Sequence, residues 1–197
     1  METRAEQKEK RRKEILATAL DQFIRRGYGA TKITDIATAA GMSVGLLFHY
    51  FESKEALYIE LIQLGVTVPA AMISHLAGLE PLAFFERCAQ QTLAFAATSD
   101  FSAKMFVLMG NAYFSEGIPE AAQEIAITAN FYQESVPLVI AGQENGTIRQ
   151  GNPLALSTAF WTAIQGSVEA YALNPLLPLP EAAWIVDIIR AKQEESK

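Results

Sequence analysis

Hydrophobic positions between residues 31 and 51 recur at intervals of three and four, the spacing that places them on one face of a helix. The first run consists of Ile33, Ile36, Ala37 and Ala40. Gly41 follows it and can adopt the left-handed conformation that closes a helix at low cost. Ser43 can then cap a second helix, over residues 44–50, through its side-chain oxygen. That helix is too short to be stable alone, so its neighbours must hold one face while the other stays free. This is the geometry of a helix-turn-helix, whose second helix enters the major groove of DNA.

The same spacing predicts helices and no strands along the rest of the chain, about nine helices in all. A first helix covers 6–26, and a fourth starts after its N-cap Ser53 and runs towards Leu76, with Pro69 expected to kink or interrupt it. Beyond the break at 78–81, further helices are predicted over 81–98, 102–115, 119–145, 153–173 and 180–195.

The composition is that of a globular protein, with 50% hydrophobic and 19% charged residues. No apolar run approaches the roughly 18 residues that span a bilayer, and one cysteine allows no intrachain disulfide. We therefore expect a cytoplasmic protein with no membrane partner. The net charge of −6 is unevenly distributed: residues 1–54 carry 10 Lys and Arg against 7 Asp and Glu, whereas 55–197 carry 6 against 15. The excess of basic residues near the short helices favours a nucleic-acid partner.

The segment from residue 36 to residue 55 resembles the DNA-binding region of the TetR family of transcriptional regulators. The matching residues are Ile36, Ala37, Ala40, Gly41, Ser43, Gly45, Leu47, Tyr50, Phe51, Ser53, Lys54 and Glu55. The chain departs from the family with Met42 in place of Val and Phe48 in place of Tyr. The resemblance implies an all-α protein. Its N-terminal three-helix helix-turn-helix domain would cover 1–54, and a C-terminal helical ligand-binding and dimerisation domain would cover 55–197.

The resemblance also implies which residues contact DNA. They are Thr31, Lys32, Ser43, Val44, Gly45, Phe48, His49, Tyr50 and Lys54. Thr31 and Lys32 stand at the start of one helix and Lys54 at the start of another, and all three are expected to contact phosphate groups of the DNA backbone. Val44 offers only an apolar contact, for example with a thymine methyl group. Phe48 lacks the hydroxyl of the family's Tyr, which leaves one backbone contact in question.

The C-terminal part is rich in aromatic residues and methionine at helical spacing, which indicates either core packing or an apolar effector pocket. The candidate ligand-binding residues are His75, Phe84, Met105, Met109, Asn111, Tyr113, Phe131, Trp161 and Gln165. The last two long helices are predicted to form a homodimer interface, because small residues on about one face permit close helix packing. These small residues are Ala155, Ala159, Ala163 and Gly166. A two-fold dimer would read a palindromic operator in double-stranded DNA.

We therefore expect a sequence-specific transcriptional regulator, a repressor released from its operator by a small, mostly apolar effector of unknown identity. The alternatives are an activator of the same fold or a helical protein-interaction module. The only histidines are His49 and His75, and neither they nor Cys88 fall in a nucleophile or metal-ligand motif. We expect no catalytic residues, no metal and no cofactor, and hence no enzyme.

Overall fold

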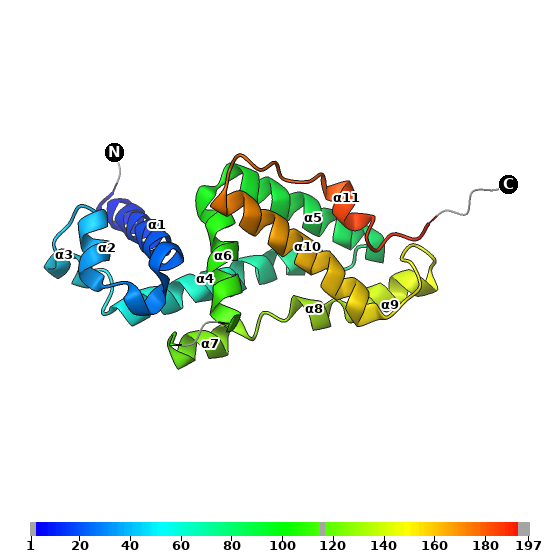
Figure 1. The fold of residues 1–197 in the computed structure, drawn as a ribbon, viewed down its shortest axis with the longest axis horizontal. Helices are drawn as coiled ribbons and strands as arrows, with labels where there is room; N and C mark the ends of the chain where they lie inside the picture. The colour runs from blue at the N-terminus through cyan, green and yellow to red at the C-terminus, as the bar shows by residue number, and fades with distance from the viewer. Residues whose placement is uncertain (1–2, 115–116, 193–197) are drawn as a thin grey trace. The chain divides into compact units, whose positions relative to one another are not determined.

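A computed structural model describes residues 3–114 and 117–192, including the helical backbone but not the side chains of Tyr113 and Phe114. Every regular element within these ranges is a helix (Figure 1), and the only strand-like pairing is an isolated bridge between Ile148 and Arg190. The predicted all-helical class is confirmed.

The chain divides into two compact units, one of Met1–Thr67 and Lys104–Thr128 and the other of Val68–Ala103 and Ala129–Lys197. The helices that begin in the first stretch are α1 (Arg4–Ala30), α2 (Ile33–Ala39), α3 (Val44–Phe48) and α4 (Lys54–His75). They are followed by α5 (Pro81–Thr98), α6 (Asp100–Phe114), α7 (Glu120–Ala126), α8 (Phe131–Glu134), α9 (Val136–Glu144), α10 (Pro153–Leu173) and α11 (Ala182–Val186). The helices α4 and α6 continue across the boundary between the units. The functional division at residue 54 therefore stays a prediction.

The core of the first unit forms where α2, α3 and the start of α4 pack their apolar positions against α1. Its fully buried side chains include Ile15, Leu20, Ile36, Leu47 and Leu61. An aromatic cluster joins α1 to α4: the Phe23 and Tyr58 rings meet edge to face at 5.0 Å, and Tyr28 lies 4.8 Å from Tyr58. Burial raises the pKa of Tyr58 to about 12, with a smaller effect from Tyr28.

Basic side chains bind the carbonyl groups at the ends of these helices. Arg11 donates to the carbonyl of Ala40, the C-cap of α2, at 2.9 Å. Arg12 donates to the carbonyl of Tyr50 at 3.3 Å, pairs with Glu60, and lies 4.3 Å from the Phe51 ring centroid. A helix C-terminus carries partial negative charge and unpaired carbonyls, so cations there are stabilising.

Lys54 does the same for α1. Its ammonium donates to the carbonyls of Tyr28 and Thr31 at 2.8 and 2.9 Å, and its nitrogen lies 4.0 Å from the Tyr28 ring centroid. Burial lowers the pKa of Lys54, because partial removal from water disfavours the charged ammonium.

Three predicted helices differ from the observed ones. The predicted 6–26 helix extends to Ala30, with a kink at Gly27, where φ is 75°. The segment 119–145 forms α7, α8 and α9, because Asn130 caps α8 and Pro137 has no amide hydrogen to continue the ladder into α9. Within the predicted helix 180–195, only Ala182–Val186 form a helix, α11, and the chain after it pairs with the segment before α10: the Arg149 amide donates to the Ile189 carbonyl, and the Ala191 amide donates to the Thr147 carbonyl. Residues 193–195 of the predicted helix lie outside the described residues.

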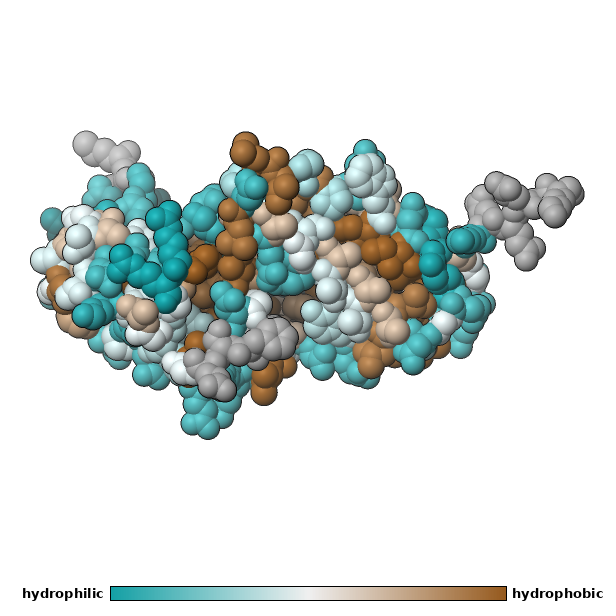
Figure 2. Space-filling model, viewed as in Figure 1, coloured by the Kyte–Doolittle hydropathy of each residue, from teal (hydrophilic) through white to brown (hydrophobic). Residues whose placement is uncertain are grey.

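The second unit is built around α5 and α10, which pack against each other and against α9 and α11. The Phe85 and Phe160 rings meet at 4.9 Å, and Trp161 follows at 5.1 Å from Phe160. Cys88 is fully buried beside this core, and burial raises its pKa to about 12. The connector between α10 and α11 exposes apolar surface, with Leu176 90% exposed (Figure 2, top of the view).

Helix α4 is long and apolar enough, by length and composition alone, to cross a membrane, which the sequence pattern did not suggest. The core helix of a globular protein passes the same test. The first half of α4 is such a core helix: Leu57, Leu61 and Ile62 are buried, and Glu60 pairs with Arg12. The helix continues through Pro69, which was expected to kink or interrupt it.

The contact between Lys54 and the end of α1 gives a stability prediction. Lys54→Ala should lower the free energy of unfolding by about 1–2 kcal/mol, because two charge-assisted hydrogen bonds to helix-end carbonyls are lost. Urea denaturation measures this change. The control is Lys13→Ala, which removes an exposed lysine from α1 and should leave stability nearly unchanged. Unchanged stability in Lys54→Ala would mean that the carbonyl contacts contribute nothing.

Candidate nucleic-acid interface and apolar pocket

The turn between α2 and α3 has the hydrogen bonds of a glycine-closed helix end. The Met42 amide donates to the Ala37 carbonyl at 3.0 Å, and the Gly41 amide donates to Thr38 at 3.1 Å. Gly41 has φ +63°, the left-handed conformation that this termination requires. Ser43 then caps α3 by accepting a hydrogen bond from the Leu46 amide at 3.2 Å. The predicted turn and cap are present.

Helix α3 is held by one side chain and leaves its opposite face exposed. Leu47 is fully buried. Two residues along a helix correspond to roughly 200° of rotation, so Gly45 and His49 lie on the side away from Leu47. Both are exposed, and between them Leu46 and Phe48 are 44% and 47% exposed. This exposed side of α3 is a surface available to a partner.

Most residues of the predicted DNA set are accessible at the protein surface. Lys32, Ser43, Gly45, Phe48 and His49 are exposed, whereas Val44 and Tyr50 are half-buried.

Thr31 and Lys54 occupy different environments from the rest of the set. Thr31 is 1% exposed, and its hydroxyl donates to the carbonyls of Gln22 and Gly27 at 3.2 and 2.8 Å. Lys54 is half-buried with its ammonium on the carbonyls at the end of α1. Sequence reasoning missed these carbonyl partners. A basic residue near a helix end is a signal for such a contact, but the partner helix is set by the tertiary fold.

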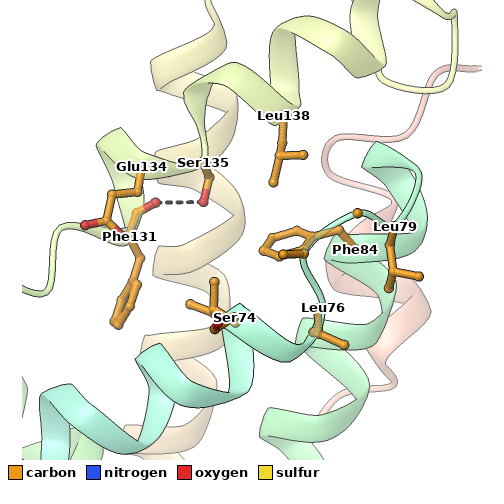
Figure 3. A pocket seen from close by; sticks show the side chains of 11 residues that line it. Ser74, Leu76, Leu79, Phe84, Phe131, Glu134, Ser135 and Leu138 are labelled. Carbon is orange, nitrogen blue, oxygen red and sulfur yellow. Dashed lines mark hydrogen bonds between the residues drawn. The ribbon is translucent and has the colours of Figure 1, made fainter.

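The second unit contains a cavity of about 280 Å³ at the turn between α4 and α5. Its lining residues are Ile73, Ser74, Leu76, Ala77, Gly78, Leu79, Phe84, Phe131, Glu134, Ser135 and Leu138. Figure 3 shows Phe84 and Leu138 on one side of the space and Phe131 on the other. The lining is mostly apolar and contains no Lys, Arg or His.

The polar groups of this cavity are unequally available. Ser135 is buried and its hydroxyl is already engaged: it donates to the Phe131 carbonyl at 2.7 Å (dashed in Figure 3) and accepts from the Trp161 indole at 2.9 Å. Ser74 and Glu134 are exposed at the edge of the cavity. A ligand in the cavity would therefore meet a hydroxyl and one carboxylate.

The predicted ligand set is distributed over both units. Phe84 and Phe131 line the cavity, and Trp161 lies behind it, 5.7 Å from the Phe131 ring. His75 is exposed, and its Nδ1 lies 2.7 Å from the Ala71 carbonyl of the same helix. Gln165 donates to Glu169 on the same helix at 2.6 Å.

The four remaining candidates belong to the first unit. Met105 and Met109 are buried next to Gly65, where a Cβ atom would collide with Met109. Asn111 is exposed on α6. The side chain of Tyr113 lies outside the described part of the structure. Sequence reasoning missed the cavity-lining residues of the α4–α5 turn, since helical periodicity carries no information about a turn.

No group of three or more His, Cys, Asp or Glu side chains that could hold a metal ion occurs among residues 3–114 and 117–192.

The sequence of the first unit matches a known family. A family model described as bacterial regulatory proteins, tetR family, matches residues 15–61. This range begins within α1 and ends within α4. The transcriptional repressor KstR2 of Rhodococcus jostii strain RHA1 is 45% identical over 53 residues, which are 27% of this chain and 26% of KstR2. The chain thus aligns with about a quarter of the length of the curated relatives it matches.

Solved structures extend the similarity of fold to most of the chain. The MbdR regulator from Azoarcus sp. CIB has a TM-score of 0.74 at 21% identity, over 89% of this chain and 95% of MbdR. AibR, solved in complex with isovaleryl coenzyme A and operator DNA, has a TM-score of 0.69 at 18% identity, over 90% of this chain and 94% of AibR. Residues 15–61 thus carry the sequence of the tetR family of bacterial regulatory proteins, and the fold is similar to that of solved regulators over most of the chain.

Proposed function

We propose that this protein is a sequence-specific, DNA-binding transcriptional regulator that acts as a homodimer. The observation that carries the proposal is the exposed side of α3, held in place by the buried Leu47 within a segment that matches the family model. A capped helix displayed at the surface in this way is suited to entering the major groove. The DNA-contacting set that we propose is Lys32, Ser43, Val44, Gly45, Phe48, His49 and Tyr50, with Thr31 and Lys54 as residues that position the helices.

The charge distribution supports a polyanionic partner for the N-terminal region. Residues 1–54 carry 10 Lys and Arg against 7 Asp and Glu, and the remainder of the chain is strongly acidic. Three of these basic side chains already donate hydrogen bonds to backbone carbonyls inside the first unit; they are Arg11, Arg12 and Lys54. Lys32 is exposed at the start of α2, so we assign phosphate binding to it first.

A homodimer is supported by an unusual surface of the second unit. On α10, Ala155, Ala159 and Gly166 are exposed, and Ala163 is half-buried, so one side of this helix offers small residues that permit close helix packing. Leu154, Leu173 and Trp184 add exposed apolar area on α10 and α11. A two-fold dimer would present two copies of α3 to a palindromic operator. By function, we divide the chain into a DNA-binding part, 1–54, and an effector-binding and dimerisation part, 55–197.

The cavity at the α4–α5 turn supports control by a small, mostly apolar effector. Helix α4 begins at Lys54, next to α3 in sequence, and contributes Ile73 and Ser74 to the cavity, so one helix joins the two regions. We propose that the effector releases a repressor from its operator. Release requires that the effector bind the DNA-free conformation more tightly than the DNA-bound one.

We further propose a cytoplasmic, non-enzymatic protein. A transcriptional activator of the same fold would have the same α3 surface. The exposed Leu46 and Phe48 are the observation that favours a second function, a helical module that docks on another protein. Apolar side chains at the centre of a surface are typical of protein interfaces.

Selection from a random pool of DNA duplexes tests the proposal. The purified full chain should enrich a palindrome at moderate salt. Lys32→Ala should weaken binding to all sequences alike and reduce the salt slope by about one per protomer bound, because one phosphate contact is lost. The matched control is Lys192→Ala, which removes the same charge from an exposed position in the second unit. Absence of enrichment by a folded protein would contradict DNA binding and favour the protein-docking alternative.

The lining of the cavity predicts which effectors bind. Among three probes with the same chain, octanol and octylamine should bind more tightly than octanoate, because Glu134 is the only charged side chain of the lining. Isothermal titration calorimetry measures the three affinities. Glu134→Gln should reduce the difference between octylamine and octanoate, whereas Glu144→Gln, an exposed change at the end of α9, should not. Octanoate binding as tightly as octanol would show that the cavity does not select against anions.

A further inference from the structure

The side chains on the exposed side of α3 are unusual for a surface that contacts DNA. From Met42 to Tyr50 the sequence contains no Arg, Lys, Asn, Gln, Asp or Glu. Leu46 and Phe48 are nearly half exposed, and Val44 is half-buried one turn before Phe48. The helix therefore presents mainly hydrocarbon to whatever it meets.

This composition removes the usual ways of reading a base pair. Guanine is most often read by a bidentate Arg or Lys, adenine by a bidentate Asn or Gln, and cytosine by a carboxylate. None of these side chains is present on α3 or in its flanking residues. The remaining base-specific feature of the major groove is the methyl group of thymine, which makes apolar contacts.

The polar groups of α3 offer little discrimination. The Ser43 oxygen already accepts the Leu46 amide at 3.2 Å as the helix cap. Its hydroxyl hydrogen and the His49 ring can each form a single hydrogen bond. A serine hydroxyl can bond to different bases and so does not discriminate between them. Single contacts of this kind position a helix more than they select a sequence.

The geometry of α3 permits close approach to the groove. Gly45 is exposed on the side opposite Leu47, and a Cβ atom there would meet no protein atom within 4 Å. Without a side chain at this position, the backbone itself can come near the bases. Phe48 on one side of Gly45 and Leu46 on the other would then lie at the level of the base edges.

We infer that α3 recognises its operator through thymine methyl groups, contacted by Leu46, Phe48 and Val44, rather than through hydrogen bonds to base edges. The inference rests on the proposed function. It predicts thymine-rich half-sites, and it predicts that cytosine methylated at carbon 5 can replace thymine in part, because the methyl group occupies the same place in the major groove.

The test compares duplexes that differ by a methyl group. The palindrome enriched from the random pool is synthesised with thymine or with deoxyuridine at each half-site position, and the affinity of the full chain is measured by fluorescence anisotropy. Removing one contacted methyl group should weaken binding about fourfold, from the transfer free energy of a buried carbon. Removing the symmetry-related pair should weaken it more than about tenfold. Deoxyuridine at thymines outside the half-sites serves as the control.

A second comparison separates the methyl group from the base pair. At a sensitive position, thymine is replaced by cytosine or by 5-methylcytosine, each paired with guanine. Both changes alter the hydrogen-bonding groups alike, but only the second keeps the methyl group. Binding should be stronger for 5-methylcytosine than for cytosine by about the same fourfold factor.

Variants identify the side chains responsible. In Leu46→Ala and Phe48→Ala the loss caused by deoxyuridine should shrink at different positions of the half-site. The control Ile127→Ala removes a still more exposed apolar side chain at the end of α7 and should leave the loss unchanged. Thermal melting verifies that each variant is folded.

The outcomes are distinct. Deoxyuridine tolerated at every position of a tightly bound palindrome overturns the inference and leaves the proposed DNA-binding function intact. Failure to enrich any duplex overturns both. A loss at deoxyuridine that persists in full in Leu46→Ala and Phe48→Ala shows that another element reads the methyl groups, and it overturns the assignment to α3.

Discussion

Cations bound to the carbonyl ends of helices hold the first unit together. Arg11 reaches the end of α2, Arg12 reaches the residues after α3, and Lys54 reaches the end of α1. Each contact joins residues more than 20 positions apart in the sequence and places positive charge at carbonyls that end or follow a helix. The contacts have a consequence for the proposed function, because basic side chains that already donate to carbonyls have fewer N–H groups left for phosphate. Lys54, for example, has one N–H left after donating to the carbonyls of Tyr28 and Thr31.

A helix as short as α3 (Val44–Phe48) can serve as a binding element because the surrounding first unit fixes its conformation. A helix of one to two turns is unstable in water, and its conformation must be imposed by its surroundings. Here Gly41 closes the preceding helix, Ser43 caps α3, and Leu47 anchors it in the core. One buried side chain and one cap are sufficient because the flanking helices are themselves fixed. The opposite side of α3 stays exposed, and Leu46, Phe48 and His49 on it are accessible to a partner.

The sequence predicted features whose causes are local and missed those whose causes are tertiary. The bounds of α5 and α10 follow directly from Pro81 and Pro153 at their starts, and Ser43 and Ser53 act as caps as expected. The prediction of one helix over 119–145 was wrong, since the break depends on how Asn130 and Pro137 act together. Thr31 and Lys54 were predicted as phosphate ligands from the family pattern, which gives residue types but not the carbonyls to which both side chains donate here; their contact with DNA stays a prediction. The cavity was predicted only in part, through Phe84 and Phe131, because most of its lining belongs to a turn without periodicity.

The central claim is that the exposed side of α3 enters DNA, and the two histidines of the chain allow a direct test. His49 lies on that side, and His75 lies at the end of α4; both are exposed. Diethylpyrocarbonate modifies exposed imidazoles, and mass spectrometry counts the modification at each residue with and without the enriched duplex. The account predicts that bound DNA protects His49 while His75 reacts as before. Equal modification of His49 in the free and DNA-bound protein would contradict it.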